Sequence, residues 1–102
     1  MQKANLTLKL NVFNSVPMFD VTPPEAILLR RIHEKPDNND VIQDVVYAGE
    51  SSASAAEEAN RLRTIYAKGA FVKAFPGEAP KLPETFEEAG FEIAGVERKK
   101  KS

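Results

Sequence analysis

The chain has 102 residues, of which 42% are hydrophobic and 28% charged, and its 14 Lys and Arg against 15 Asp and Glu give a formal net charge of −1. This composition suits a single globular domain, and the absence of cysteine excludes a disulfide framework, a thiolate nucleophile and cysteine-bound zinc. No stretch approaches the ~20 apolar residues of a membrane span, and the start MQKANLTLKLN differs from the apolar run of a secretory signal. We therefore expect no membrane association and a cytoplasmic location, in the host cytoplasm if the chain is viral.

The segment from residue 4 to 13 carries the clearest strand signal. Aliphatic side chains alternate with polar ones from Leu6 to Val12, and a period of two would place the aliphatic set on one face. One apolar and one polar face is typical of an antiparallel sheet covered on a single side. We therefore expect Lys9 to lie on a solvent-facing sheet surface that is open to a ligand.

An amphipathic helix is predicted over residues 23 to 35. Thr22 suits the N-cap and Pro23 the first helical position, while Glu25 would complete a capping box by reaching back to the cap. The apolar stripe of this helix would pack on the sheet. Pro36 and the polar residues after it would end the helix.

A second strand and a second helix are predicted further along the chain. Residues 41 to 48 are rich in β-branched side chains, which favour a strand. Ser54 and Glu57 form another capping box, which would open an alanine-rich helix that runs to about Lys68, with Gly69 as its C-cap. Small residues on this helix suit self-association, although an amphipathic stripe more often faces its own domain.

Phe71 and Phe75 recur at helical spacing just before Pro76. The spacing favours a short helix that buries both rings in the core. If the rings are exposed instead, they lie among lysines and resemble the stacking surfaces of single-stranded nucleic acid binders. Both interpretations remain open at this point.

Charge is segregated in the C-terminal part. Residues 61 to 81 hold five cations and one acid, whereas residues 84 to 97 hold five acids and no cation. A short helical turn is expected from Pro83 to Gly90, followed by a last strand or extended arm over residues 91 to 97. The five acids would then flank the end of the chain.

Four consecutive cations, from Arg98 to Lys101, stand next to the final serine. Without these four, 10 Lys and Arg face 15 Asp and Glu, so a basic run follows an acidic body. Such runs are commonly disordered tails that bind polyanions, and a merely solubilising end is the alternative. We predict a domain of residues 1 to 97 and a flexible basic tail of residues 98 to 102, which folds back on the nearby glutamates when no polyanion is bound.

Little in the sequence supports catalysis. His33 is the one histidine, and Glu34 cannot face it from the adjacent position of a helix. The glutamates at 84, 87 and 88 have spacings that suit a shared divalent ion, but a solvated acidic face is the better interpretation. We expect no enzymatic activity, no cofactor and no metal.

Three strings of the sequence, VTPPEAILLRRIHEK, ANRLRTIYAKGAFVKAFPG and LPETFEEAG, resemble small proteins of tailed bacteriophages. They are similar in style to the single-stranded-DNA-binding RNA polymerase cofactors of short-tailed phages. This resemblance implies single-stranded DNA as ligand, a role in transcription or replication, RNA polymerase as a second partner, and self-assembly into a homo-oligomer.

Together these patterns predict an α+β fold with a small antiparallel sheet of about three strands, packed on one side by two main helices. For function we expect a non-enzymatic single-stranded DNA-binding protein whose cations follow the phosphates and whose aromatic rings stack on bases. The competing hypothesis is a protein–protein interaction module in phage assembly or host takeover. The candidate nucleic acid contacts are Lys9, Arg61, Arg63, Lys68, Lys73, Arg98, Lys99, Lys100 and Lys101, and the candidate stacking residues, if exposed, are Tyr66, Phe71 and Phe75.

Overall fold

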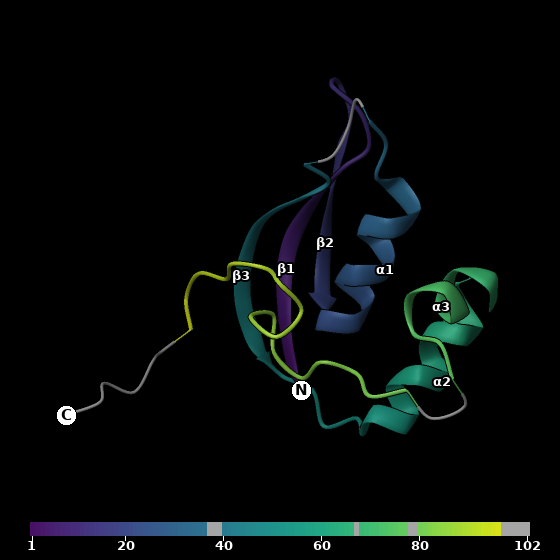
Figure 1. The fold of residues 1–102 in the computed structure, drawn as a ribbon. Helices are drawn as coiled ribbons and strands as arrows, with labels where there is room; N and C mark the ends of the chain where they lie inside the picture. The colour runs from purple at the N-terminus through teal and green to yellow at the C-terminus, as the bar shows by residue number, and fades with distance from the viewer. Residues whose placement is uncertain (37–39, 67, 78–79, 97–102) are drawn as a thin grey trace.

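A three-stranded sheet with helices on one of its faces forms the framework of the protein (Figure 1). The structure, a computed structural model, describes residues 1–36, 40–66, 68–77 and 80–96. The elements in chain order are β1 (Gln2–Lys9), β2 (Ser15–Val21), α1 (Pro23–His33), β3 (Ile42–Glu50), α2 (Ala55–Ile65) and α3 (Lys68–Ala74). All strand pairs in the order β2-β1-β3 are antiparallel, which confirms the predicted α+β class.

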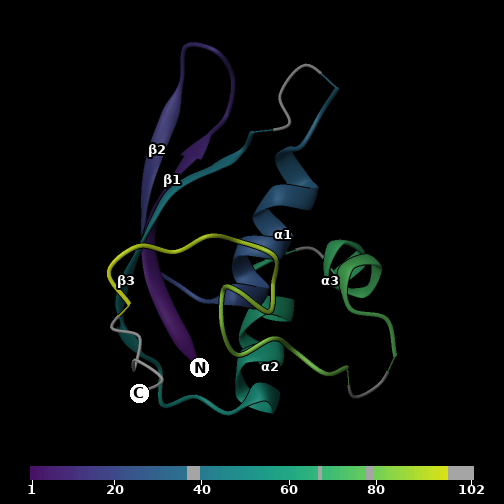
Figure 2. The same cartoon turned by 60° about the vertical axis from the view of Figure 1, so that its left-hand side comes forward.

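The third strand of the sheet is β2, and the described part of the segment predicted as a last strand or extended arm, residues 91–96, forms no strand of the sheet. Proline weakens a strand signal because it cannot donate to the ladder, but an edge strand tolerates it, and Pro17 lies in the middle of the edge strand β2. Residues 91–96 instead run beside β3 (Figure 2), where Ala94 forms an isolated parallel bridge with Val46. One edge of the sheet is thus partly covered, whereas β2 forms the other edge.

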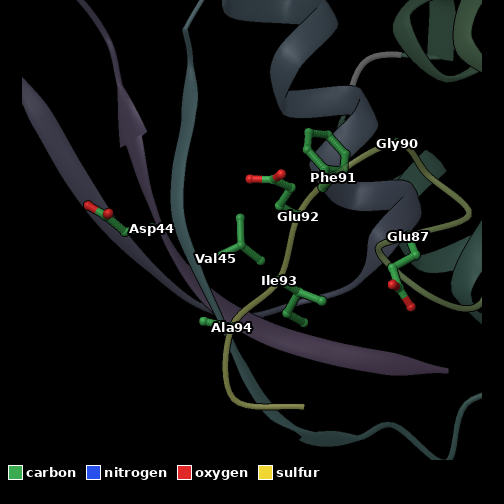
Figure 3. A pocket seen from close by; sticks show the side chains of 8 residues that line it. All are labelled: Asp44, Val45, Glu87, Gly90, Phe91, Glu92, Ile93 and Ala94. Carbon is green, nitrogen blue, oxygen red and sulfur yellow. The ribbon is translucent and has the colours of Figure 1, made fainter. Parts of the chain in front are cut away.

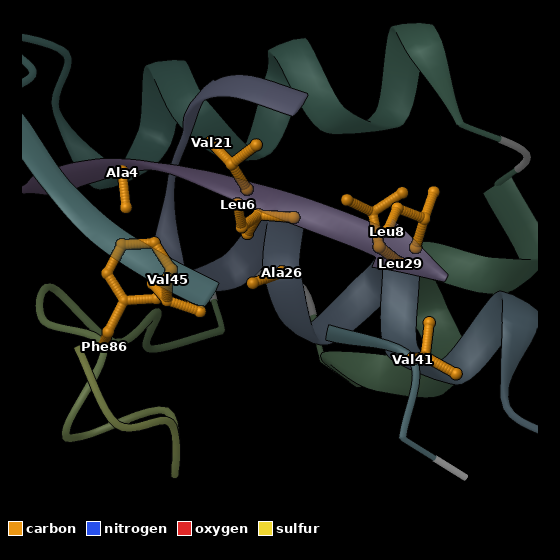
Figure 4. Packing of buried hydrophobic residues seen from close by; sticks show 9 residues of the cluster. All are labelled: Ala4, Leu6, Leu8, Val21, Ala26, Leu29, Val41, Val45 and Phe86. Atoms are coloured by element: carbon orange, nitrogen blue, oxygen red, sulfur yellow. The ribbon is translucent and has the colours of Figure 1, made fainter. Parts of the chain in front are cut away.

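Helix α1 lies between two hydrophobic clusters and holds the layers together. Its Leu29 packs with Leu6 and Leu8 of β1 in the cluster beneath the sheet, which also contains Phe86 (Figure 4). Its Leu28 belongs to a second cluster, shared with α2 and α3. Because neighbouring leucines of one helix serve both clusters, removal of either side chain would leave a cavity that costs about 2–5 kcal/mol.

The helix boundaries confirm part of the capping analysis. Thr22 Oγ1 accepts the backbone N–H of Glu25, and Ser54 and Glu57 form the reciprocal capping box. The predicted single helix to Lys68 is wrong, since α2 ends at Ile65 and a separate helix, α3, begins two residues after its C-cap. Gly69 therefore lies inside α3 instead of capping α2.

The N-terminal strand fixes the segment that follows α3. The backbone N–H of Gln2 donates to the carbonyl of Glu84, and the Gln2 side-chain oxygen accepts the N–H of Phe86, both at 2.8 Å. Residues 84–90 form turns in place of the expected helical turn. Gly90, with a φ of 90°, then redirects the chain towards β3.

Candidate functional site

A cluster of polar side chains is enclosed where the N-terminus of α1 meets α2. Glu58, only 2% exposed, accepts hydrogen bonds from the hydroxyl of Thr22 and from two nitrogens of Arg61. A nitrogen of Arg61 also lies 2.9 Å from an oxygen of Glu25. The second oxygen of Glu25 accepts the hydroxyl of Tyr66 at 2.8 Å. One guanidinium thus joins two carboxylates from different helices.

The protonation of this cluster follows from these contacts. Burial disfavours the charged form of Glu58, but the hydrogen bonds from Arg61 and Thr22 outweigh burial and lower its pKa. Burial, together with the hydrogen bond to Glu25, raises the pKa of Tyr66. Glu58 is therefore held as a hydrogen-bond acceptor at neutral pH, which differs from a group prepared to exchange protons.

The cluster is consequently a structural joint. Within the described residues, no buried side-chain nitrogen or oxygen lacks a hydrogen-bond partner. A fully satisfied buried network fixes a particular packing of its elements. The expected capping role of Glu25 is accordingly not fulfilled, because its carboxylate turns to Arg61 and Tyr66.

Among the described residues, the predicted nucleic acid contacts lie on different elements and in different environments. Arg61 is engaged in the cluster, and the guanidinium of Arg63 lies 4.6 Å from the ring centre of Phe71. Lys73 is exposed on α3, while Lys9 lies half-buried on β1. The side chain of Lys68 and the run Arg98–Lys101 lie outside the described residues.

The three predicted stacking residues are not presented to solvent. Phe71 is fully buried and Phe75 nearly so, and their ring centres lie 5.3 Å apart in the core between the helices. Tyr66 is partly buried and its hydroxyl is bonded to Glu25. The condition for stacking on bases, exposure of these rings, is therefore not met.

The large exposed side chains gather instead on the β1–β2 hairpin. Of the nine large hydrophobic residues that are exposed in the described part of the chain, five lie between residues 10 and 19: Leu10, Val12, Phe13, Val16 and Phe19. Phe13 is 92% exposed and Phe19 is 69% exposed. Isolated exposed apolar residues are ordinary, but five within one ten-residue hairpin are a concentration that can mark an interaction segment. We call these five residues the hairpin patch.

The turn that carries Phe13 is internally braced. The side-chain oxygen of Asn11 accepts the backbone N–H groups of Phe13 and Asn14, at 2.8 and 3.0 Å, and also the side-chain amide of Asn14. Backbone hydrogen bonds between Leu10, Asn11 and Asn14 close the same turn. Side chains of asparagine commonly stabilise turns in this way. The exposed ring of Phe13 is thus carried by a pre-organised turn between β1 and β2.

The sequence contained a signal for this surface that the strand analysis misassigned. Alternation places Val12 on the buried face of a strand to residue 13, but β1 ends at Lys9 and Val12 is 75% exposed. Residues 10 to 19 contain no charged side chain, and this ten-residue stretch coincides with the hairpin patch. The two asparagines inside an apolar run were the available sign of a turn.

The remaining chemistry of the described residues is limited. No group of three or more His, Asp or Glu is placed to hold a metal ion within residues 1–36, 40–66, 68–77 and 80–96. None of the described helices has the length and apolar character needed to cross a membrane.

Comparison of the chain with protein-family models, curated proteins and solved structures gave no match.

Proposed function

We propose that this protein is a non-enzymatic interaction module that binds another protein through the hairpin patch. The observation that carries this proposal is the display of Phe13, an almost fully exposed aromatic ring on a turn braced by Asn11. Aromatic side chains that enter a partner's pocket supply much of the energy of protein interfaces. A braced turn lowers the entropic cost of binding, because the backbone that carries the ring is already ordered.

The chemistry of the hairpin patch indicates which kind of partner surface it would fit. Its residues carry no charge, and the turn that carries Phe13 also contains two asparagine amides, which are hydrogen-bonded to each other. Such a surface suits an apolar pocket with a polar, uncharged rim, which is the usual anatomy of a protein interface. A polyanion would gain little here, because its affinity depends on cations that neutralise phosphates.

Photo-crosslinking from the turn tests the proposal. The probe is p-benzoyl-phenylalanine in place of Phe13, with the same group in place of Val72 as the matched control, since Val72 is 56% exposed but lies on α3. In cells that naturally contain the protein, we expect an adduct with one other protein from position 13 and none from position 72. Adducts only with nucleic acid or only with a second copy, or no adduct, would contradict the proposal.

A second candidate function, binding of single-stranded DNA, is favoured by a cavity of about 560 Å³ between α1 and α3. Arg31 and Lys73 line it together with Ile32 and Glu34, and neither cation forms an ion pair within the described part of the chain. These two residues, in place of Arg61 and Arg63, would contact phosphates.

Fluorescence anisotropy with a labelled DNA strand over a salt series tests this second function. Binding should weaken with salt by a slope of about −0.7 per phosphate contact. Arg31→Ser and Lys73→Ser should each reduce that slope, whereas Lys81→Ser, a change at an exposed lysine outside the cavity, should not. A slope equal in all variants would exclude this cavity as the DNA site.

A further inference from the structure

The two outer edges of the sheet differ in how they are covered. Residues 91–96 run beside β3, and Figure 3 shows Ala94 where this segment meets the strand. The N–H of Ala94 donates to the carbonyl of Val45, and its carbonyl accepts the N–H of Tyr47, at 2.9 and 2.8 Å. Within the described residues, no segment pairs with the outer side of β2. The edge of β2 is therefore the one to which a further strand could be added.

The side chains of β2 do little to prevent such an addition. Residues 15–19, with the sequence SVPMF, contain no charged side chain, and Phe19 is 69% exposed. Short, apolar, uncharged segments without proline pair readily with identical segments of other copies. Proteins protect exposed edges with charges, bulges or proline. The register of β2 shifts near Asp20, which has a φ of 56°, and Pro17 is the protecting residue inside the segment 15–19.

Hydrogen bonds at the turn show which residues of the hairpin bond directly to each other. The N–H of Leu10 donates to the carbonyl of Asn14 at 2.9 Å. In an antiparallel pair, directly bonded positions alternate with positions whose backbone groups point away from the partner strand. Steps of two residues from this pair give the next directly bonded positions, which are Leu8 with Val16 and Leu6 with Met18.

Pro17 lies at an intervening position, opposite Thr7. The N–H of Lys9, two residues further along β1, donates towards the β3 side at 2.8 Å, which agrees with this alternation. The nitrogen and the carbonyl of Pro17 therefore face the outer edge of β2. At this edge Ser15 and Phe19 present both an N–H and a carbonyl, whereas Pro17 presents a carbonyl only.

We propose that Pro17 prevents the outer edge of β2 from pairing with the same edge of a second copy. A strand added there would place a carbonyl opposite the proline ring, and that carbonyl would find no donor. A buried carbonyl without a partner weakens association, and the ring occupies the place of the missing hydrogen. In the separate chain the missing donor costs no ladder bond, because it lies on the solvent side of the edge.

Separate chains also keep the hairpin patch accessible. Val16 and Phe19 of the patch lie on β2, so a strand of a second copy along this edge would lie beside them. Only this consequence rests on the function proposed for the patch. The role of Pro17 follows from the backbone of the hairpin alone.

Restoring the N–H at position 17 tests the proposal. Pro17→Thr supplies a donor and a side chain that favours strands, and sedimentation equilibrium over a concentration series measures self-association. We expect Pro17→Thr to self-associate about tenfold more tightly than wild type, or more, because the opposed carbonyl gains a partner. Ser15→Thr is the matched control, since it favours the strand at an outward-facing position that already has its N–H, and it should behave like wild type. Equal self-association of Pro17→Thr and either wild type or Ser15→Thr would overturn the proposal.

A second variant separates loss of the proline from gain of the pairing. Pro17→Lys also restores the N–H, but a charge on an edge strand opposes pairing, so this variant should associate no more than wild type. Circular dichroism checks that each variant is folded, and Pro17→Ala supplies the same N–H if Pro17→Thr is not. Hydrogen exchange should show the amides of Ser15 and Phe19 protected in associated Pro17→Thr and unprotected in wild type and Pro17→Lys. Protection of these amides in wild type, association of Pro17→Lys as tight as that of Pro17→Thr, or association without this protection would each overturn the role of Pro17.

Discussion

The junction of α1 with α2 and the β1–β2 hairpin differ in which side chains they bury: the junction buries charged groups, and the hairpin exposes apolar ones. In the junction, Glu58 is 2% exposed and Glu25 is nearly as buried. Both carboxylates nevertheless accept hydrogen bonds from neighbouring side chains. The hairpin exposes apolar groups, of which Phe13 and Phe19 are the most exposed rings. Burial of a charge normally costs stability unless it is paired, and exposure of an apolar cluster normally signals a binding surface.

We assign different roles to the two regions. The chemically conspicuous residues, two glutamates and an arginine, hold the helices together. The chemically plain residues of the hairpin patch are those that we propose to act on a partner. Variants in the two regions should therefore differ both in stability and in binding.

The largest effect should come from a buried ring that the sequence left open as a stacking residue. Phe71→Ala should lower the free energy of unfolding by about 3–5 kcal/mol, because it removes a fully buried side chain and leaves a cavity. Urea unfolding measures the loss. A change below about 1 kcal/mol would show that this phenylalanine is not a core residue.

The next effect concerns the guanidinium that joins the two glutamates. Arg61→Met should cost about 2–3 kcal/mol, less than the ~3–5 kcal/mol of a fully buried pair, because Arg61 is 43% exposed. Arg31→Met, at an exposed arginine of α1 without an ion pair among the described residues, is the control and should change stability by less than about 0.5 kcal/mol. Equal losses of unfolding free energy in the two variants would contradict a specific stabilising role for Arg61 between the two glutamates.

Acid should weaken the same joint. The pKa of Glu58 is lowered in the folded state, so its contribution is present above the ordinary glutamate pKa of about 4.3 and is lost as pH falls through the lowered folded value. Urea midpoints between pH 3 and 7 should fall at the acid end in the wild type and fall less steeply in Glu58→Gln. Parallel curves for the two proteins would contradict this assignment.

Alkali should act through Tyr66 in the opposite sense. The pKa of Tyr66 is raised by burial and by the bond to Glu25, so its contribution is present below the ordinary tyrosine pKa of about 10 and is lost as pH rises towards the folded value. Tyr66→Phe should cost about 1 kcal/mol at neutral pH and show a smaller further loss above pH ~10. If both proteins lose stability equally in alkali, another group is responsible.

The fold was largely readable from the sequence because its signals are local. The caps at Thr22 and Ser54 depend on residues three positions apart, and the alternation from Leu6 to Leu8 depends on the pleat. β2 was missed because Pro17 weakens the local signal, while its position at the edge of the sheet, a property of the whole fold, removes the penalty.

The candidate site was less readable because exposure depends on distant partners. Arg61 carries the same charge whether it faces solvent or Glu58, and only the packing of α1 on α2 decides between these environments. Phe71 and Phe13 are likewise the same residue type, but Phe71 is fully buried whereas Phe13 is almost fully exposed. The charge-free stretch around the two asparagines of the hairpin was the one local sign of the surface that we propose.

The affinity of the protein crosslinked from position 13 tests the central claim most directly. It should be measured by isothermal titration for wild type, Phe13→Ser and Val72→Ser, after urea unfolding has shown that the three have equal stability within about 0.5 kcal/mol. We predict that Phe13→Ser binds at least 30-fold more weakly, as expected for loss of an aromatic anchor worth about 2 kcal/mol, and that Val72→Ser binds like wild type. Equal affinity of Phe13→Ser and wild type would contradict the assignment of the hairpin patch as the binding surface.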